Sequence, residues 1–299
     1  MENVCNINGS LVPEAEATVS VLDRGFLFGD SVYEVVRTVD GVPFAWPEHW
    51  QRLHLSAEGI ALQLDLDEAT VARRVAETMA AAGDGEHYVR VIVTRGTGSA
   101  PNIDLDYAPG PPTWVVMVRP APQVAGRPAK VALVPRLRND RRALDPAAKS
   151  GNYLNNVLGL AEAKQRGATD CIMLNRDGSL TEASTSNLFV RLDGTWCTPP
   201  LQAGILAGIT RGLLLQWLTE AGTPVAERDL TADDLRRADE MFLSSTLRNV
   251  GPVTHLDDRE LCGPEGGPST RELMALFDER FARRMAELDA PRWRALQNG

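Results

Sequence analysis

The chain has 299 residues, of which 43% are hydrophobic and 24% charged, as in an ordinary soluble globular protein. Its formal net charge of −9 argues against a nucleic-acid partner, and without an apolar run of about 18 residues or a basic-then-apolar start we expect neither a membrane nor a secreted protein. The four scattered cysteines form no C-x-x-C pair, so we expect no disulfide framework, no metal site and a cytoplasmic location.

The N-terminal part of the chain is expected to contain short strands and two helices. Helical spacing follows Pro47, and a second helix is expected over residues 67–82. The loop Arg95–Pro112 is long enough to be functional or to act as a lid. The expected strands are Val4–Asn8, Ser10–Val12, Val32–Val39, Val42–Ala45, Tyr88–Thr94 and Trp114–Arg119.

Alternating prolines over residues 121–128 indicate a linker, because proline cannot continue a helix or a central strand. The prediction is therefore a domain at 1–120 and a second at 129–299. Strands mixed with helices in both parts favour an α/β or α+β fold over a sandwich or a bundle. In the second domain we expect strands at Val131–Val134 and Glu240–Ser244, a hairpin at Asp177-Gly178, and helices at Asn155–Arg166, Thr210–Ala221, Thr231–Arg237 and Thr270–Leu288.

Lys149 is one of only three lysines, against 28 arginines, and it lies in the polar run 146–156. Arginine replaces lysine as a surface cation but cannot form a Schiff base, because its guanidinium stays protonated. Lys149 is therefore a candidate catalytic residue. The alternative is that a skewed composition left this lysine by chance.

Three further segments carry candidate chemistry. Glu182 interrupts a small and apolar stretch, and it either meets a cation or is an ordinary surface glutamate. Thr210 follows the glycines of 204–208 at a helix start, where it either helps to hold an anion or simply caps the helix. Residues 244–246 are three consecutive hydroxyl residues that form either a phosphate cup or an ordinary turn.

In this order, these residues resemble the class IV aminotransferases, the pyridoxal-phosphate (PLP) family that contains branched-chain and D-amino-acid aminotransferases and aminodeoxychorismate lyase. Residues 28–37 resemble the family's strand beside the substrate, and His49 to Leu53 match its H-x-x-R-L helix. The resemblance runs from about residue 5 to 280. It implies fold type IV, with a smaller N-terminal α/β domain and a larger C-terminal barrel-like domain. It also implies a homodimer with the cofactor in the cleft between the domains.

The resemblance also implies roles for individual residues. Lys149 would hold PLP as a Schiff base and move the proton, Glu182 would keep the ring nitrogen protonated, and Tyr153 would bind the phenolic oxygen. The phosphate would be held by Arg52, Ile209, Thr210, Ser245 and Thr246. Phe28 and Tyr33 would lie beside the substrate.

Arg90 is the residue that bears on the substrate. It is a lone charge in an apolar strand, and it either points outward or binds a carboxylate. Branched-chain enzymes carry a similar Y-x-R. The loop after Thr94-Arg95-Gly96 lacks the Arg and His of the familiar D-amino-acid enzymes, yet residues 32–36 and 244–246 resemble that group. Chirality therefore stays open.

We expect a transaminase that moves an amino group between an amino acid, branched-chain-type or D, and a 2-oxo acid. The alternatives are an aminodeoxychorismate lyase-type enzyme, an (R)-selective amine transaminase and a non-catalytic PLP-binding protein. The lyase typically carries threonines where this chain has Glu34 and Val35. Arg248-Asn249 also departs from many relatives, without an assigned consequence.

Overall fold

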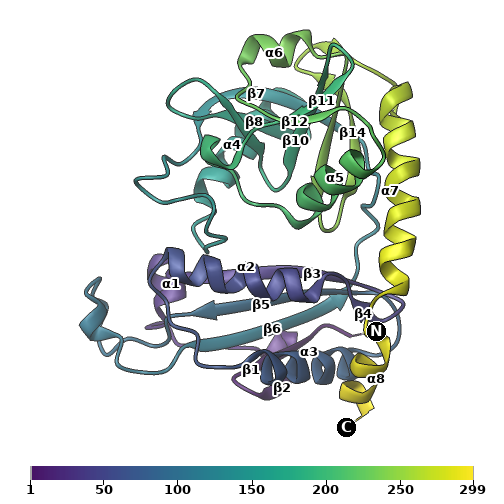
Figure 1. Cartoon of the computed structure of the whole chain (residues 1–299). Coiled ribbons are helices and arrows are strands. Elements are labelled where there is room, and N and C mark those ends of the chain that lie inside the picture. Colours follow the sequence, from purple (N-terminus) through teal and green to yellow (C-terminus); the bar gives the residue numbers. More distant parts are fainter. Residues whose placement is uncertain (1, 299) are drawn as a thin grey trace. The chain divides into compact units, whose positions relative to one another are not determined.

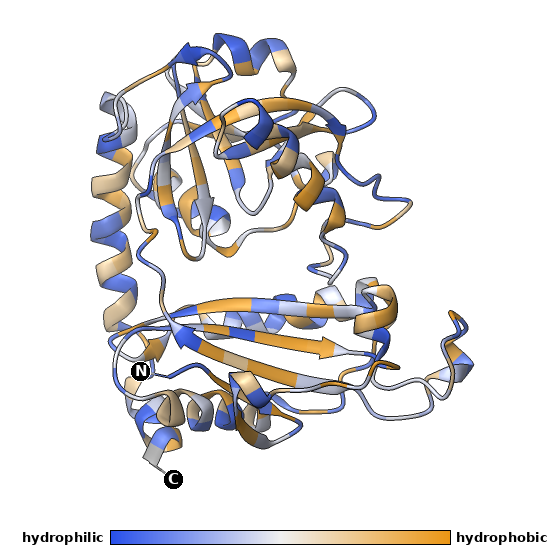
Figure 2. Ribbon diagram, turned by 180° about the vertical axis from the view of Figure 1, so that it is seen from behind, coloured by the Kyte–Doolittle hydropathy of each residue, from blue (hydrophilic) through white to orange (hydrophobic). Residues whose placement is uncertain are grey.

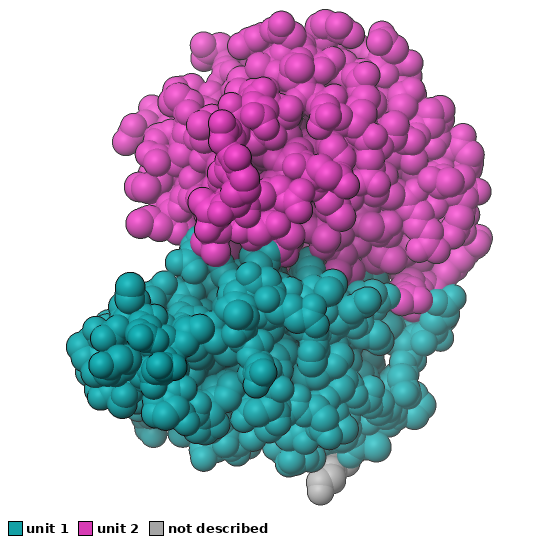
Figure 3. Space-filling view, turned by 60° about the vertical axis from the view of Figure 1, so that its left-hand side comes forward, with its two compact units in different colours: residues 1–123, 148–152, 285–299 teal, residues 124–147, 153–284 magenta. Residues whose placement is uncertain are grey.

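The computed structural model describes residues 2–298, which fall into two units (Figure 3). Unit 1 takes in the described parts of 1–123, 148–152 and 285–299, and unit 2 consists of 124–147 and 153–284. The first change of unit falls in the segment expected to be a linker. The chain also returns to unit 1 twice, at 148–152 and from 285 onward. The prediction of a single division at 121–128 contains neither return. Composition and periodicity describe local order, so they cannot show that a short segment pairs with a distant strand.

Unit 1 contains, within residues 2–298, a six-stranded sheet in the order β2-β1-β6-β5-β3-β4, with antiparallel neighbours. The strands are β1 (Val4–Ile7), β2 (Ser10–Pro13), β3 (Ser31–Val39), β4 (Val42–Pro43), β5 (His87–Thr94) and β6 (Thr113–Pro120). The helices are α1 (Arg24–Phe28), α2 (Trp46–Gly59), α3 (Glu68–Ala82) and α8 (Ala290–Asn298), with short 3-10 turns at Glu14–Glu16 and Leu105–Tyr107.

Valines at alternate positions of β3, β5 and β6 build one buried face of this sheet, whose strands are mainly hydrophobic (Figure 2). Side chains of α2 and α3 join them in a single core that includes Leu53, Val75 and Met79. Because side chains alternate across a strand, β3 and β5 present their other residues on the opposite face. On that second face Val35, Arg90 and Ile92 are half-buried, whereas Tyr33 is buried.

The C-terminal helix α8 packs on unit 1. Trp293 is 3% exposed and lies edge-to-face against Trp46, with 5.3 Å between ring centroids. Arg292 donates to both carboxylate oxygens of Glu68, at 2.8 and 2.6 Å, and Glu68 also accepts from the indole nitrogen of Trp46. The sequence predicts a last helix that ends at Leu288, so α8 was not anticipated.

Unit 2 is built around a curled, mostly antiparallel sheet, with nine strands in the described part of the chain (Figure 1). The order is β12-β11-β10-β13-β14-β7-β8-β9, with β15 beside β14, and β9 also contacts β10. The strands are β7 (Ala129–Leu137), β8 (Asp170–Leu174), β9 (Leu180–Ala183), β10 (Asn187–Leu192), β11 (Thr195–Thr198), β12 (Val225–Glu227), β13 (Glu240–Ser245), β14 (Asn249–Leu256) and β15 (Arg259–Glu260). The helices are α4 (Leu154–Gln165), α5 (Ile209–Glu220), α6 (Ala232–Arg237) and α7 (Pro268–Ala286), with a 3-10 turn at Leu201–Ala203.

The mixed α/β class predicted from the sequence is confirmed in both units. Strand β14 was missed because Gly251 and Pro252 lie inside it, and these residues usually argue against a strand. Pro252 nevertheless lies opposite Phe242 in the antiparallel pairing of β13 with β14. Within residues 2–298, no helix is both long and apolar enough to cross a membrane.

Truncating Trp293 tests the contribution of α8. We expect Trp293→Ala to lower the free energy of unfolding by about 3 kcal/mol, because a large aromatic side chain leaves a cavity in the unit 1 core. Urea denaturation followed by circular dichroism measures the change. The neighbouring Arg294→Ala, at an exposed position, is the control. Equal midpoints for the two variants would show that the packing of Trp293 adds nothing to stability.

Candidate functional site

Lys149 is fixed through its own backbone at the edge of β3. Its N–H donates to Ser56 Oγ of α2 at 3.0 Å, and its carbonyl accepts from the Tyr33 N–H at 3.0 Å. Ser150 forms a bridge with Val32. This edge is open to the segment because β4 pairs with β3 only near Thr38 and Val39. The position of the lysine Cα is therefore set from both sides.

The residues after Lys149 make this close approach possible. Gly151 donates its N–H to the Ser31 carbonyl at 2.8 Å, and a Cβ on Gly151 would overlap Ser31 Oγ. Asn152 Nδ2 donates to the carbonyl of Gly29 at 2.9 Å, and Gly29 has the left-handed φ of 67°. The polar run that singled out Lys149 in the sequence thus serves to seat it on β3.

Two cations lie against the ring of Tyr33. Lys149 Nζ is 4.5 Å and Arg90 Cζ is 4.0 Å from its centroid. Arg90 pairs with Val35 in the β3–β5 register, so it is on the same sheet face as Tyr33. Arg90 Nε is buried without a hydrogen-bond partner, and no carboxylate of the described residues forms an ion pair with this side chain. A buried guanidinium nitrogen without a partner is costly, so this face is suited to an anion.

Arg52 is held by a buried carboxylate. Its Nε and Nη2 donate to the two oxygens of Glu34, both at 2.7 Å, and His49 Nδ1 is 2.7 Å from Glu34 Oε2. Burial alone would raise the pKa of Glu34, but Arg52 and His49 hold it at about 2. Burial lowers the pKa of His49, so the neutral ring donates Nδ1–H to Glu34. The sequence predicts Arg52 as a phosphate ligand, and the structure adds the pair that sets its guanidinium plane.

Glu182 on β9 is buried in unit 2, so the surface-glutamate alternative is wrong. Its Oε1 accepts from Arg138 Nε and Nη2 at 3.2 and 3.1 Å. Its Oε2 accepts from Asn187 Nδ2 at 3.2 Å and from the Leu206 N–H at 3.0 Å. Both carboxylate oxygens of Glu182 are therefore held by two donors each, which fixes the orientation of the carboxylate.

Arg138 and Asn187 were missed by the sequence reasoning. A signal was available for Arg138, because a buried glutamate requires a cation and Arg138 lies in the polar segment that leads to Lys149. Asn187 stands in the quoted run around Glu182, but no spacing rule connects an amide to a carboxylate five residues away across a turn. Both side chains are therefore additions made by the tertiary structure.

The start of α5 has the features of an anion site. Its N-cap is Gly208 rather than Thr210, and no side chain caps the helix, so the simple-cap alternative for Thr210 is wrong. Ser244 pairs with Asn187 in the β10–β13 register, and its buried Oγ has no hydrogen-bond partner among the described residues. Uncapped N–H groups and an unsatisfied hydroxyl are donors that a phosphate would accept from. The residues present in unit 2 therefore fit a phosphate group.

The other predicted residues lie as follows. Ser245 Oγ accepts from the Arg248 N–H at 3.3 Å in the turn that contains Thr246. Tyr153 is the half-buried N-cap residue of α4 in unit 2. Phe28 ends α1 in unit 1, and Arg24 Cζ lies 5.1 Å from its ring centroid.

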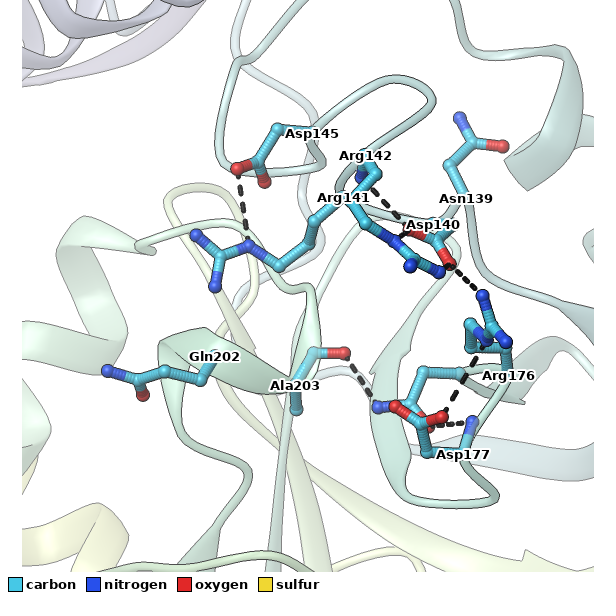
Figure 4. Close-up of a pocket in the computed structure, with 10 residues that line it drawn as sticks. Asn139, Asp140, Arg141, Arg142, Asp145, Arg176, Asp177, Gln202 and Ala203 are labelled. Atoms are coloured by element: carbon cyan, nitrogen blue, oxygen red, sulfur yellow. Dashed lines mark hydrogen bonds and ion pairs between the residues drawn. The ribbon is translucent and has the colours of Figure 1, made fainter.

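A separate cavity of about 590 Å³ in unit 2 contains none of the predicted site residues (Figure 4). Its charged groups pair with one another: Asp140 with Arg142 at 2.9 Å and with Arg176 at 3.5 Å, and Arg141 with Asp145 at 3.2 Å. These charges leave little net attraction for a ligand. In the part of the chain that the structure describes, no group of three or more His, Cys, Asp or Glu side chains is placed to hold a metal ion.

Comparison with known proteins places the chain among the aminotransferases. Residues 31–256 match the family "Amino-transferase class IV". A putative branched-chain-amino-acid aminotransferase of Methanocaldococcus jannaschii is 36% identical, over 91% of this chain and 94% of that protein. A D-alanine aminotransferase of Listeria innocua is 35% identical, over 95% of this chain and 98% of that protein.

A solved structure shows the same fold. The branched-chain aminotransferase of Thermoproteus uzoniensis, crystallised with norvaline, superposes with a TM-score of 0.84 at 30% identity and covers 92% of this chain and 93% of its own. This agreement confirms the two-domain fold that the sequence resemblance implies. The chain therefore belongs to the class IV aminotransferase family and is an aminotransferase.

Proposed function

We propose that this aminotransferase uses PLP, bound covalently through Lys149, to move an amino group between an α-amino acid and a 2-oxo acid. The observation that carries the proposal is the seating of Lys149: its backbone is fixed on β3, and its ammonium shares the Tyr33 ring with the unpaired Arg90. When bound, PLP supplies an electron sink that stabilises negative charge on the substrate α-carbon. Lys149 Nζ is then the group that takes the proton from that carbon.

Residues of unit 2 are proposed to hold the cofactor ring and its phosphate. Glu182, held in place by Arg138, accepts a hydrogen bond from the ring nitrogen. Tyr153 binds the phenolic oxygen. The proposed phosphate ligands are the N–H groups of Ile209 and Thr210 and the hydroxyls of Thr210, Ser245 and Thr246, and Arg52 is proposed as a further phosphate ligand.

Arg90 is proposed to bind the substrate carboxylate, with Tyr33 and Phe28 beside the substrate. The nearest neighbours of Arg90 on its sheet face, Val35, Ile92 and Met117, are half-buried and apolar, and Tyr33, Arg37 and Tyr88 lie on the same face. An apolar amino-acid side chain would therefore bury favourably there. This preference agrees with the branched-chain relative and leaves either enantiomer possible.

The lyase alternative is not favoured. The lyase carries hydroxyls at the positions of Glu34 and Val35, whereas here the Glu34 carboxylate is fully engaged with Arg52 and His49. A carboxylate in that state only accepts hydrogen bonds. The substrates of an (R)-selective amine transaminase carry no carboxylate, so such an enzyme needs no residue to bind one. A variant of Arg90 therefore distinguishes this alternative from the proposed function.

We also propose a cytoplasmic homodimer. The buried Arg24 donates to the carbonyls of Asn102, Ile103 and Asp104, at 2.6, 3.0 and 3.3 Å, and so fixes the long loop after β5. In that fixed loop Ile103 is 79% and Leu105 51% exposed. Exposed apolar side chains on a fixed loop are typical of an interface, and the proposed partner is a second copy of the chain.

Borohydride reduction tests the role of Lys149. With PLP present, reduction should leave a cofactor adduct on Lys149 in the native protein, located by mass spectrometry of peptides. Lys149→Ala should lose the adduct, whereas Lys130→Ala and Lys164→Ala should keep it. These are the other two lysines of the chain. A stable adduct on either of them would overturn the assignment.

Replacement of Arg90 tests the carboxylate site. A lost bidentate contact should cost roughly 2–4 kcal/mol, so we expect Arg90→Leu to lower kcat/KM for an α-amino acid by about 30- to 1000-fold. The same variant should leave kcat/KM for 1-phenylethylamine unchanged, because this amine has no carboxylate. Arg119→Leu, on the exposed end of β6, is the control. Equal losses for acid and amine would show that Arg90 is structural.

The dimer is tested by sedimentation at micromolar concentration, where an obligate interface should persist. The double variant Ile103→Glu, Leu105→Glu should shift the protein towards a monomer, because two buried charges oppose association. Arg294→Glu, a charge change at an exposed position of α8, should leave the dimer intact. A native protein that sediments as a fully active monomer would contradict the proposal.

A further inference from the structure

Asn187 connects Glu182 to the segment that leads into α5. It is the first residue of β10 and is buried. Its Nδ2 donates to Glu182 Oε2 at 3.2 Å and to the Leu206 carbonyl at 3.0 Å. Both partners are acceptors, so only the NH₂ end of the amide can face them, and the orientation of the side chain is fixed by chemistry.

The other end of the same amide faces Gly208. A Cβ at position 208 would overlap Asn187 Oδ1, so the glycine is required by the amide rather than by an unusual φ. Leu206 closes the cluster, since its N–H donates to Glu182 Oε2 at 3.0 Å. Glu182, Asn187 and residues 206–208 are thus packed and bonded as one group, directly before the helix start at Ile209.

The backbone of Asn187 is held by the sheet of unit 2. Its backbone pairs with Ser244 in the antiparallel β10–β13 register, and the Ala183 N–H donates to the Ser186 carbonyl in the turn before it, at 2.8 Å. Glu182 is held independently on its other oxygen by Arg138, whose Nη1 donates to Asn155 Oδ1 at 3.3 Å. Asn187 therefore links the Glu182 carboxylate to the segment before α5 through one side chain that is itself held by the sheet.

We propose that Asn187 is a positioning residue that aligns the two ends of the cofactor site, the Glu182 carboxylate and the α5 start, through one amide. This inference rests on the proposed function, in which Glu182 takes the ring nitrogen and α5 takes the phosphate. A side chain that touches neither ligand then controls the geometry for both. Small errors in such geometry weaken binding strongly, because charged hydrogen bonds depend on direction.

Two small probes report separately on the Glu182 carboxylate and on the start of α5. Both are used with the full-length protein from which the cofactor has been removed. Pyridoxine carries the ring without the aldehyde or the phosphate, and inorganic phosphate reports the α5 start. Their affinities are measured by calorimetry or ligand-observed NMR. Glu182→Gln should weaken pyridoxine alone, and Thr210→Ala should weaken phosphate alone, each by about tenfold. These single-end variants calibrate the probes.

Asn187→Asp and Asn187→Ala should each weaken both probes by at least about tenfold. The aspartate keeps the shape but loses the donors and places a charge beside Glu182. Asn175→Asp is the matched control: Asn175 Nδ2 donates to the Ala203 carbonyl at 3.1 Å, next to the same segment but not to Glu182. It should leave both affinities unchanged. If the Asn187 variants weaken the binding of only one probe, or of neither, the inference is overturned.

Gly208→Ala tests the link from the opposite side, and as a single variant it leaves Asn187 itself unchanged. The added methyl must push the Asn187 amide, so pyridoxine affinity should fall at least about fivefold, although the atoms nearest to that methyl belong to Asn187 and Arg211 rather than to Glu182. In an Asn187→Ala background the methyl meets no amide, so it should cause no further loss. The same loss in both backgrounds would overturn the coupling. Failure of the native protein to bind either probe would instead count against the proposed function.

Discussion

The structure depends on the pairing of a five-residue segment, 148–152, with the edge of β3. A lysine side chain has four rotatable bonds, so its amine can be positioned only if its backbone is. Here the Lys149 N–H is bound by α2 and its carbonyl by Tyr33 of β3. The strand can accept this segment because β4 is too short to cover its edge. The edge that would otherwise be unpaired thus becomes the support of the candidate catalytic residue.

A second constraint is the pairing of carboxylates that are buried or half-buried. Glu34, Asp30 and Glu182 are each bound by arginine through two-point or paired contacts. Arginine provides a planar fork for such contacts, which lysine cannot reproduce. Arg248 belongs to the same pattern: it lies 3.6 Å from the buried Asp170, and its Nη1 donates to the Arg127 carbonyl. The departure at Arg248-Asn249 therefore has a structural role in unit 2.

Arg90 stands apart from these pairs. Among the described residues it has an aromatic neighbour but no carboxylate partner, and its cross-strand neighbours Val35 and Met117 are apolar. This lack of a carboxylate partner is the observation behind the proposed carboxylate site at Arg90. The same reasoning distinguishes Arg52, which already has Glu34 as a permanent partner and can serve a ligand only alongside it. Binding at these two arginines is therefore governed by different electrostatics.

The sequence by itself determined the mixed α/β class, most helices and strands, and Lys149 and Glu182 as candidates, because periodicity, turn residues and a skewed lysine count are local properties. Only the tertiary structure decided that Lys149 belongs to unit 1, that α8 buries Trp293 against Trp46, and that Arg138 and Asn187 surround Glu182. Strand β14 shows the limit within a single element, since Pro252 argues against the strand that its partners nevertheless stabilise. Local patterns fix which conformation a segment prefers, whereas its partners are chosen by the burial and hydrogen bonding of residues far away in the chain.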